Sequence, residues 1–280
     1  MSGPRGPVRL VVCDLDGTLV GPELDITARV REAVAAAEAR DVTVALATGR
    51  MYRSALRFAR ALALRAPLIC YQGAYVRELP GPDGQPGALL RELPMSAAAA
   101  KRAISWSRTH GLGPHLNVAD RLVMERGDES AADYERISGI DAEFVPDLQA
   151  TVRGPVTKVL SVGPAGLPAA VLAAARAEFA GRAEVTVSHP EYLEFTAPGV
   201  TKGRALRWLA RRLGVPLGAT MAIGDQYNDL EMLLAAGYGV AMASAPAEVR
   251  AAARFVTASV AEDGAALAIE ALVLGRGTLD

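Results

Sequence analysis

The chain has 280 residues, of which 51% are hydrophobic and 22% are charged, so it is long and apolar enough to fold around a substantial core. This length fits one large domain or two smaller ones. The formal net charge of −1 excludes an overall basic field of the kind that attracts nucleic acid or a membrane surface. No apolar run approaches the ~20 residues that span a bilayer. The first ten residues, MSGPRGPVRL, lack the apolar stretch of a secretory signal.

The chain has two cysteines, Cys13 and Cys70, which are too few for a disulfide scaffold and do not have zinc-site spacing. Both end apolar runs, which predicts buried free thiols. We therefore expect a cytoplasmic protein with no nucleic-acid partner and no membrane association.

Strand and helix signals alternate through the first part of the chain. Short apolar, β-branched runs indicate buried strands, and amphipathic runs indicate helices. In chain order we expect a strand at 8–13, a helix at 26–40 with Thr27 as N-cap, a strand at 42–48, a helix at 51–64 and a strand at 67–71. This alternation is typical of a parallel sheet covered by helices.

The segment ELPGPDGQPG (78–87) interrupts the alternation with Pro and Gly, and indicates a turn or a domain boundary. The pattern is less regular from there to about residue 190. It predicts a small α+β unit with helices near 96–110 and 168–180 and strands at 121–125, 156–162 and 183–188.

The alternation returns after this insertion. We expect helices at 201–214, 228–237, 245–253 and 262–274, and strands at 220–225, 239–243 and 254–257. Two α/β pieces therefore flank an insertion.

Polar residues follow the predicted strands at their carboxyl ends, where open parallel sheets bind ligands. They are Asp14 and Asp16 after the first strand, Thr48 and Gly49 after the second, and Asp225, Asn228 and Asp229 after the strand at 220–225, with Lys202 at the start of the preceding helix. Clustered carboxylates raise one another's pKa unless a cation lies among them. Oxygen ligands of this kind suit Mg²⁺, and hydroxyl, amide and ammonium donors suit phosphate. The combination points to phosphoryl transfer.

Simpler interpretations of each element remain open. Asp-Gly is a common turn pair, so Asp14 and Asp16 could belong to an ordinary turn. Thr48-Gly49 could be a plain strand exit, and Asp225 could cap the next helix. Lys202 could be a solvated first-turn residue, although a cation is disfavoured at a helix N-terminus.

Four segments together resemble the motifs of the haloacid dehalogenase superfamily, in the order and spacing of its Cof-type (subfamily IIB) phosphatases. They are DLDGT (14–18), ATGR (47–50), GVTKG (199–203) and GDQYND (224–229). The resemblance covers about 8–79 and 190–275 and is weak in the insertion. It implies an α/β fold, with a Rossmann-like parallel sheet core that has helices on both faces, plus an inserted α+β cap domain. The core would be 1–82 and 189–280, the cap 83–188, and the hinges 80–87 and 188–192.

The resemblance also implies a role for each motif residue. Asp14 would attack phosphorus and form an aspartyl-phosphate, and Asp16 would act as acid and then base. Thr48, Gly49, Lys202 and Asn228 would bind the phosphoryl group. Asp14, the Asp16 backbone carbonyl, Asp225 and Asp229 would hold Mg²⁺. Two positions depart from the Cof-type pattern: Gln72 stands where Asn is common, and Ala243-Ser244 stands where Gly-Asn is common.

The resulting expectation is a Mg²⁺-dependent phosphatase that hydrolyses a small phosphorylated metabolite, such as a sugar phosphate or a phosphorylated cofactor, as a monomer or homodimer. A phosphomutase or phosphotransferase using the same aspartyl-phosphate, and a non-catalytic metabolite-binding module, are the alternatives. Lys158 could face the active site from the insertion, but an exposed strand residue is the stronger expectation. His110, His115 and His189 are expected as plain surface or turn residues.

Overall fold

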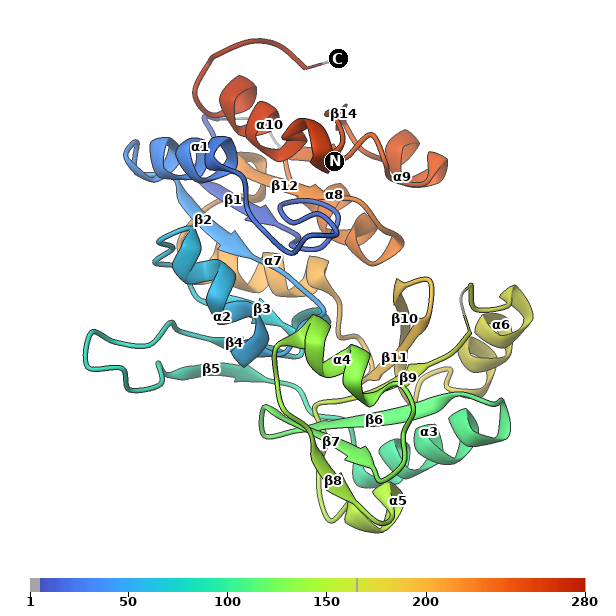
Figure 1. Ribbon diagram of the computed structural model, residues 1–280. Coiled ribbons are helices and arrows are strands. Elements are labelled where there is room, and N and C mark those ends of the chain that lie inside the picture. The colour runs from blue at the N-terminus through green and yellow to red at the C-terminus, as the bar shows by residue number, and fades with distance from the viewer. Residues whose placement is uncertain (1–5, 165, 280) are drawn as a thin grey trace.

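The computed structural model describes residues 6–164 and 166–279. Its centre is a five-stranded parallel sheet in the order β14-β13-β12-β1-β2 (Figure 1). The strands are β1 (Leu10–Cys13), β2 (Thr43–Leu46), β12 (Thr220–Gly224), β13 (Tyr238–Ala241) and β14 (Phe255–Val256). Each lies within a run that the sequence predicts to be a strand, apart from the first residue of β13.

Helices cover both faces of this sheet. On one face lie α1 (Ala28–Glu38), α2 (Tyr52–Ala61) and α10 (Gly264–Leu272), and on the other α7 (Lys202–Arg212), α8 (Leu230–Ala235) and α9 (Ala247–Ala252). Side chains of β1 alternate between the two faces. Val11 and Cys13 pack with the first group of helices, and Leu10 and Val12 with the second. Burial on both sides explains the continuous apolar run that predicts this strand.

A small antiparallel sheet extends the core beyond β2. It consists of β3 (Leu68–Cys70), β4 (Tyr75–Arg77) and β5 (Leu89–Glu92), and a parallel bridge between Ala47 and Ile69 links it to β2. The Pro/Gly segment 80–87 forms the tip between β4 and β5. The prediction of a hinge there is wrong, because the segment joins two paired strands of one sheet.

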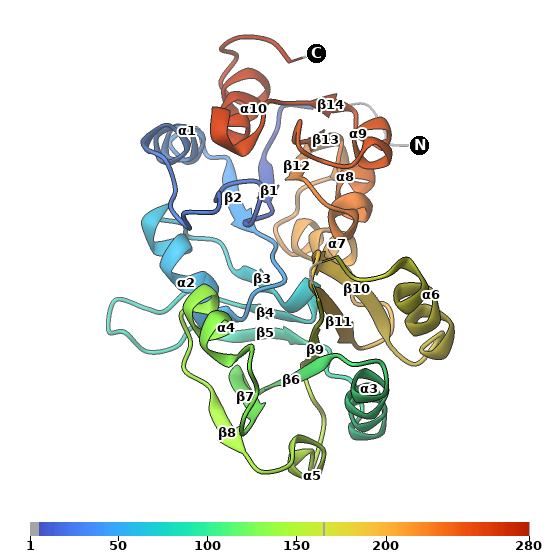
Figure 2. The same ribbon diagram turned by 45° about the vertical axis from the view of Figure 1, so that its right-hand side comes forward.

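A second sheet, in the order β10-β11-β9-β6-β7-β8, lies beyond the carboxyl ends of the core strands (Figure 2). All pairs of neighbouring strands in this sheet are antiparallel, except that β7 and β8 are parallel to each other. Its strands are β6 (Gly113–Val118), β7 (Arg121–Glu125), β8 (Glu143–Val145), β9 (Lys158–Val162), β10 (Glu184–His189) and β11 (Tyr192–Thr196). The sequence does not predict β6, β8 or β11.

Four helices accompany the second sheet: α3 (Ala97–Thr109), α4 (Ala131–Ser138), α5 (Leu148–Thr151) and α6 (Ala169–Glu178). Helix α4 lies on the side that faces α2 of the core (Figures 1 and 2). The predicted α/β class, with a parallel core sheet and a separate mixed sheet, is confirmed. The division into 1–82 with 189–280 and an inserted cap at 83–188 stays a proposal, and β11 pairs with the second sheet.

Both cysteines are buried and free, as predicted. Trp106 packs with Phe179 and Phe195, at ring centroid distances of 6.1 and 5.9 Å. None of the described helices combines the length and the hydropathy needed to cross a bilayer.

Candidate active site

The turn after β1 brings the carboxylate of Asp14 to the edge of the sheet. The Asp14 backbone N–H donates to the Ile223 carbonyl at 2.9 Å, which fixes it beside β12. Gly17 then turns the chain with a φ of +82°, and a Cβ at this position would lie 2.4 Å from Oδ2 of Asp225. Only glycine combines this backbone conformation with so close an approach. The turn thus lets two acidic loops meet.

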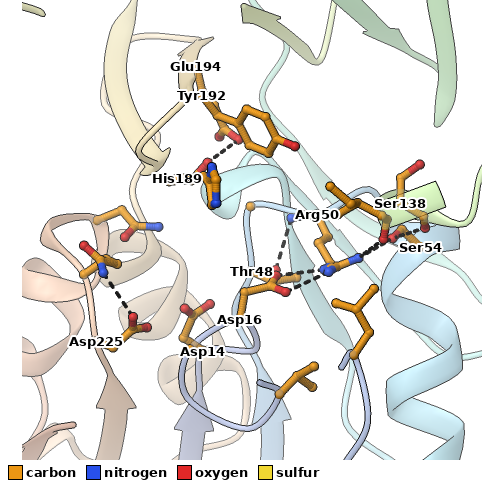
Figure 3. A pocket seen from close by; sticks show the side chains of 18 of the residues that line it. Asp14, Asp16, Thr48, Arg50, Ser54, Ser138, His189, Tyr192, Glu194 and Asp225 are labelled. Carbon is orange, nitrogen blue, oxygen red and sulfur yellow. Dashed lines mark hydrogen bonds and ion pairs between the residues drawn. The ribbon is translucent and has the colours of Figure 1, made fainter. Parts of the chain in front are cut away.

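Three carboxylates converge at this edge. Asp14, Asp225 and Asp229 are buried, and each offers an oxygen within 4.8 Å of the others. Asp14 and Asp225 stand side by side at the ends of neighbouring strands (Figure 3). Lys202, the first residue of α7, donates to Asp14 Oδ1 at 2.6 Å and to Asp229 Oδ1 at 2.7 Å. The predicted convergence of these residues is therefore present.

The electrostatics of this cluster show an excess of negative charge. Burial, and then the charge of Asp229, hold the pKa of Asp14 well above its ordinary value, although Lys202 opposes the shift. Burial and the Asp229 charge also raise the pKa of Asp225, to about 6. Burial lowers the pKa of Lys202, but the charges of Asp14 and Asp229 outweigh this and raise it. One ammonium among three carboxylates leaves room for a cation.

Further groups orient the acidic side chains. Thr18 Oγ1 donates to Asp225 Oδ1 at 3.1 Å, and Gln226 Nε2 donates to Asp225 Oδ2 at 3.2 Å. Asp229 Oδ2 accepts from the backbone N–H groups of Asp225 and Gln226, both at 3.0 Å. The sequence reasoning assigned no role to Thr18 or Gln226, although Thr18 closes the DLDGT motif and could have been found there.

The donor set fits a hard divalent cation such as Mg²⁺. Asp225 has its oxygens occupied only by two neutral donors, and Asp14 has one oxygen bonded to Lys202. Both oxygens of Asp229 already accept hydrogen bonds, one from Lys202 and one from the loop after β12. Asp229 is therefore better placed to orient these groups than to bind a metal. Oxygen-only donors with a net charge of about −2 match a cation that binds through one or two carboxylates.

Asp16 points away from this cluster. Its carboxylate accepts from Arg50 Nε at 2.8 Å and from Nη2 at 2.7 Å (Figure 3). The same guanidinium donates through Nη1 to Ser54 Oγ at 3.2 Å and to the Ile137 carbonyl, at the end of α4, at 2.9 Å. Arg50 thus connects the turn after β1, the core helix α2 and the second sheet's helix α4.

The loop after β2 presents two donors beside Asp14. Thr48 is buried, and its Oγ1 accepts from the Arg50 backbone N–H at 3.1 Å. This leaves the hydroxyl proton of Thr48 available to another acceptor. A Cβ on Gly49 would lie 2.5 Å from Nε2 of Gln72, so a side chain here would displace the Gln72 amide.

A buried polar network faces the core from the second sheet. Lys158 Nζ donates to the Gly49 carbonyl at 2.8 Å and to Glu194 Oε1 at 3.0 Å. Gln72 Nε2 donates to Glu194 Oε2 at 2.9 Å, and Asn228 Nδ2 donates to Gln72 Oε1 at 3.1 Å. The expectation of an exposed Lys158 is wrong, because Glu194 and the Gly49 carbonyl compensate its burial. Asn228 therefore contacts Gln72, and its predicted phosphate contact stays a prediction.

The histidines also differ from expectation in part. His115 is fully buried, with Nε2 2.9 Å from Ser130 Oγ and 3.2 Å from Asp128 Oδ2, so it is not a surface residue. His189 is exposed, as expected, and it lines a cavity between the carboxylate cluster and the second sheet. His110 stacks on Trp106 at the end of α3, at a ring centroid distance of 3.8 Å.

A cavity of about 570 Å³ lies between the carboxylate cluster and the second sheet. Apart from Asp229, all the predicted site residues line it: Asp14, Asp16, Thr48, Gly49, Lys202, Asp225 and Asn228. Glu194, Tyr192 and His189 line it from the opposite side (Figure 3). Its volume suits a small molecule.

Comparison with known proteins agrees with this geometry. Residues 11–269 match the model of the haloacid dehalogenase-like hydrolase family. The putative phosphatase YxeH of Bacillus subtilis is 30% identical over 96% of this chain and 99% of its own length. The 5-amino-6-(5-phospho-D-ribitylamino)uracil phosphatase YcsE of the same organism is 27% identical over 95% of this chain and 96% of its own.

A solved structure extends the likeness to the fold. A haloacid dehalogenase-like hydrolase from Bacteroides thetaiotaomicron superposes with a TM-score of 0.81 at 28% identity, over 94% of this chain and 99% of that one. The chain therefore belongs to the haloacid dehalogenase-like hydrolase family and is a phosphatase of this family, a phosphoric monoester hydrolase.

Proposed function

We propose that this enzyme is a Mg²⁺-dependent phosphatase that hydrolyses a small phosphorylated metabolite, a sugar phosphate or a phosphorylated cofactor, through an aspartyl-phosphate on Asp14. The observation that carries the proposal is the buried Asp14 carboxylate, which faces Asp225 and contacts Lys202 in the cavity. The relative YcsE is named as a phosphatase of a phosphorylated ribitylaminouracil, which supports a small phosphorylated metabolite as the substrate.

Asp14, the backbone carbonyl of Asp16 and Asp225 would hold the Mg²⁺ ion, with Asp229 in support. When bound, the ion would neutralise the carboxylates and the phosphoryl oxygens, so that an anionic nucleophile can approach an anionic substrate.

Asp14 would attack phosphorus with the oxygen that Lys202 does not hold. Lys202 has used two of its three N–H donors, on Asp14 and Asp229, and the third is available to a phosphoryl oxygen. The Thr48 hydroxyl and the Gly49 N–H lie on the same cavity wall and would complete the cradle. Fixed donors of this kind stabilise the charge that develops in the transition state.

Asp16 would supply and then recover the proton. It would protonate the leaving alkoxide as the ester bond breaks, and the resulting carboxylate would take a proton from the water that attacks the aspartyl-phosphate. Its side chain is 47% exposed and lines the cavity, so the leaving oxygen of a bound substrate can reach it while Arg50 holds it in place.

The test is release of inorganic phosphate from p-nitrophenyl phosphate and from a panel of phosphorylated metabolites, with Mg²⁺ and with chelator. We expect Mg²⁺-dependent release in the parent and its loss in Asp14→Asn. Asp83→Asn, the same change on an exposed loop, is the control and should keep activity. Turnover by Asp14→Asn, or full activity in chelator, contradicts the proposal.

The same assay addresses the alternatives. A phosphomutase or phosphotransferase would transfer the group to a second hydroxyl with little release of phosphate, and a binding module would bind the metabolite without turnover. The proposed monomer or homodimer is tested by analytical ultracentrifugation.

A further inference from the structure

The cations on the cavity wall, apart from Lys202, are already paired. Among the described residues lining the cavity they are Arg50, Arg136 and Lys158. Arg50 holds Asp16 through two hydrogen bonds of 2.8 and 2.7 Å. The side chain of Arg50 is 10% exposed and also donates to Ser54 Oγ and the Ile137 carbonyl, so the guanidinium is held in place beside Asp16.

Lys158 is the cation deepest in the wall opposite the carboxylate cluster, and its charge is cancelled there. Its side chain is 1% exposed and that of Glu194 is 2% exposed, with 3.0 Å between Nζ and Oε1. Glu194 also accepts from Ser188 Oγ at 2.8 Å and from Gln72 Nε2 at 2.9 Å. A buried pair of this kind is strongly destabilised when one partner is removed. Lys158 is therefore not available to neutralise an anion of the substrate.

Two further basic side chains line the cavity, Arg136 and His189, and both are exposed. Arg136 has a side-chain exposure of 68% and pairs with Asp133 at 3.4 Å, so its interactions are weakened by solvent. His189 is exposed, and its Nδ1 accepts from the Glu191 backbone N–H at 3.4 Å, at the turn between β10 and β11. Neither group supplies a fixed positive charge inside the cavity.

We propose, on the basis of the phosphatase function proposed above, that the cavity selects monophosphates whose leaving alcohol is uncharged and discriminates against a second anionic group. A carboxylate or second phosphate on the substrate would lie against the Glu194 and Asp16 carboxylates with no free cation between them. Neutral hydroxyl or amide groups meet no such repulsion. They can bond to the Ser188 and Tyr192 hydroxyls, which line the cavity.

The parent enzyme tests this directly with matched substrates. Glycerol 3-phosphate and 3-phosphoglycerate differ by a hydroxymethyl against a carboxylate, and sorbitol 6-phosphate and 6-phosphogluconate differ in the same way. We expect kcat/KM to be at least about tenfold higher for the neutral member of each pair, because like charges in an enclosed site repel strongly. A member that is not turned over is measured as a competitive inhibitor of p-nitrophenyl phosphate hydrolysis.

The variant Glu194→Gln keeps the shape of the side chain but removes the charge that cancels Lys158. We expect the preference for the neutral member to fall by about tenfold in this variant, because Lys158 then faces the substrate as an unpaired cation. Glu143→Gln is the control. Glu143 also pairs with a cation, Arg121, on the second sheet, but its side chain is 52% exposed and does not line the cavity. This control should keep the parent's preference.

The outcomes separate this proposal from the phosphatase function. Hydrolysis of p-nitrophenyl phosphate with equal kcat/KM for both members of the pairs overturns the selectivity and leaves the phosphatase function intact. A folded Glu194→Gln enzyme with an unchanged preference also overturns it. Absence of any phosphate release overturns both. Where Glu194→Gln does not fold, by circular dichroism, the comparison in the parent decides alone.

Discussion

Replacing Gly17 by alanine would displace a proposed metal ligand without changing any charged group. Gly17 lies in the turn after β1, next to Asp225, and a Cβ there would lie 2.4 Å from Asp225 Oδ2. An ordinary contact needs at least 3.4 Å, so Asp225 or the turn must move by about 1 Å.

The substitution should lower both the stability of the fold and the rate of catalysis, for separate reasons. The φ of +82° disfavours any side chain, which should lower the free energy of unfolding by about 1–2 kcal/mol. The displacement of about 1 Å in the catalytic constellation should lower kcat/KM by about 100-fold. Because the ligand has moved, the affinity for Mg²⁺ should fall together with the rate.

The assay is phosphate release against Mg²⁺ concentration, with stability measured by urea unfolding in chelator. Gly111→Ala is the control, since Gly111 has a φ of +70° and open space around its Cβ. We expect it to lose similar stability and to keep both rate and Mg²⁺ affinity. Gly17→Ala with the Mg²⁺ affinity and kcat/KM of the control would refute the reasoning.

Three further predictions concern the same charges and the contact between the sheets. Lys202→Met leaves Asp14 and Asp229 buried without a cation and should cost about 3–5 kcal/mol in urea unfolding with chelator, so an unchanged unfolding midpoint contradicts this. The pKa of Asp225 is raised from 3.8 to about 6 by burial and the Asp229 charge. Protonated Asp225 therefore stabilises the folded state in chelator below about pH 4, and this stabilisation is lost as the pH rises through about 6. The loss is at most about 3 kcal/mol, and a flat profile of unfolding free energy against pH excludes it. Asp120, from the turn between β6 and β7, accepts from the first two backbone N–H groups of α2 at 3.0 and 3.2 Å. Asp120→Ala should cost about 1–2 kcal/mol, measured by thermal unfolding, and a melting temperature equal to the parent's contradicts the capping role.

The carboxylate cluster could be predicted because its signals are local. Each parallel strand is buried on both faces and reads as a short apolar run, so its carboxyl end is visible in the sequence. Asp14 and Asp225 both follow such runs. This prediction does not require the order of the strands, because all strands of a parallel sheet have their carboxyl ends at the same edge. Lys202 was visible as a cation at a helix start, where the helix dipole disfavours it.

The opposite wall of the cavity could not be predicted in the same way. The burial of Lys158 depends on Glu194, which lies 36 residues away on another strand. Strand β11, which carries Glu194, has a buried acidic residue in the middle of its apolar pattern. Strand β6 likewise carries the buried polar residues His115 and Asn117. Binary patterning fails for such strands, because the face that should be apolar lines or adjoins a polar site.

These failures of the pattern have a common physical meaning. Unpaired carboxylates at strand ends, a lysine at a helix start and an ion pair inside a sheet each destabilise a fold in isolation. Here they meet around one cavity, where a cation and a phosphoryl group would offset their cost. Binding to the folded state alone raises stability by mass action. The destabilised cluster and the affinity for Mg²⁺ are then two aspects of one charge imbalance. Asp225→Asn removes a carboxylate that is bonded only to the neutral Thr18 and Gln226 side chains, so it should gain stability in chelator while it loses stabilisation by the metal.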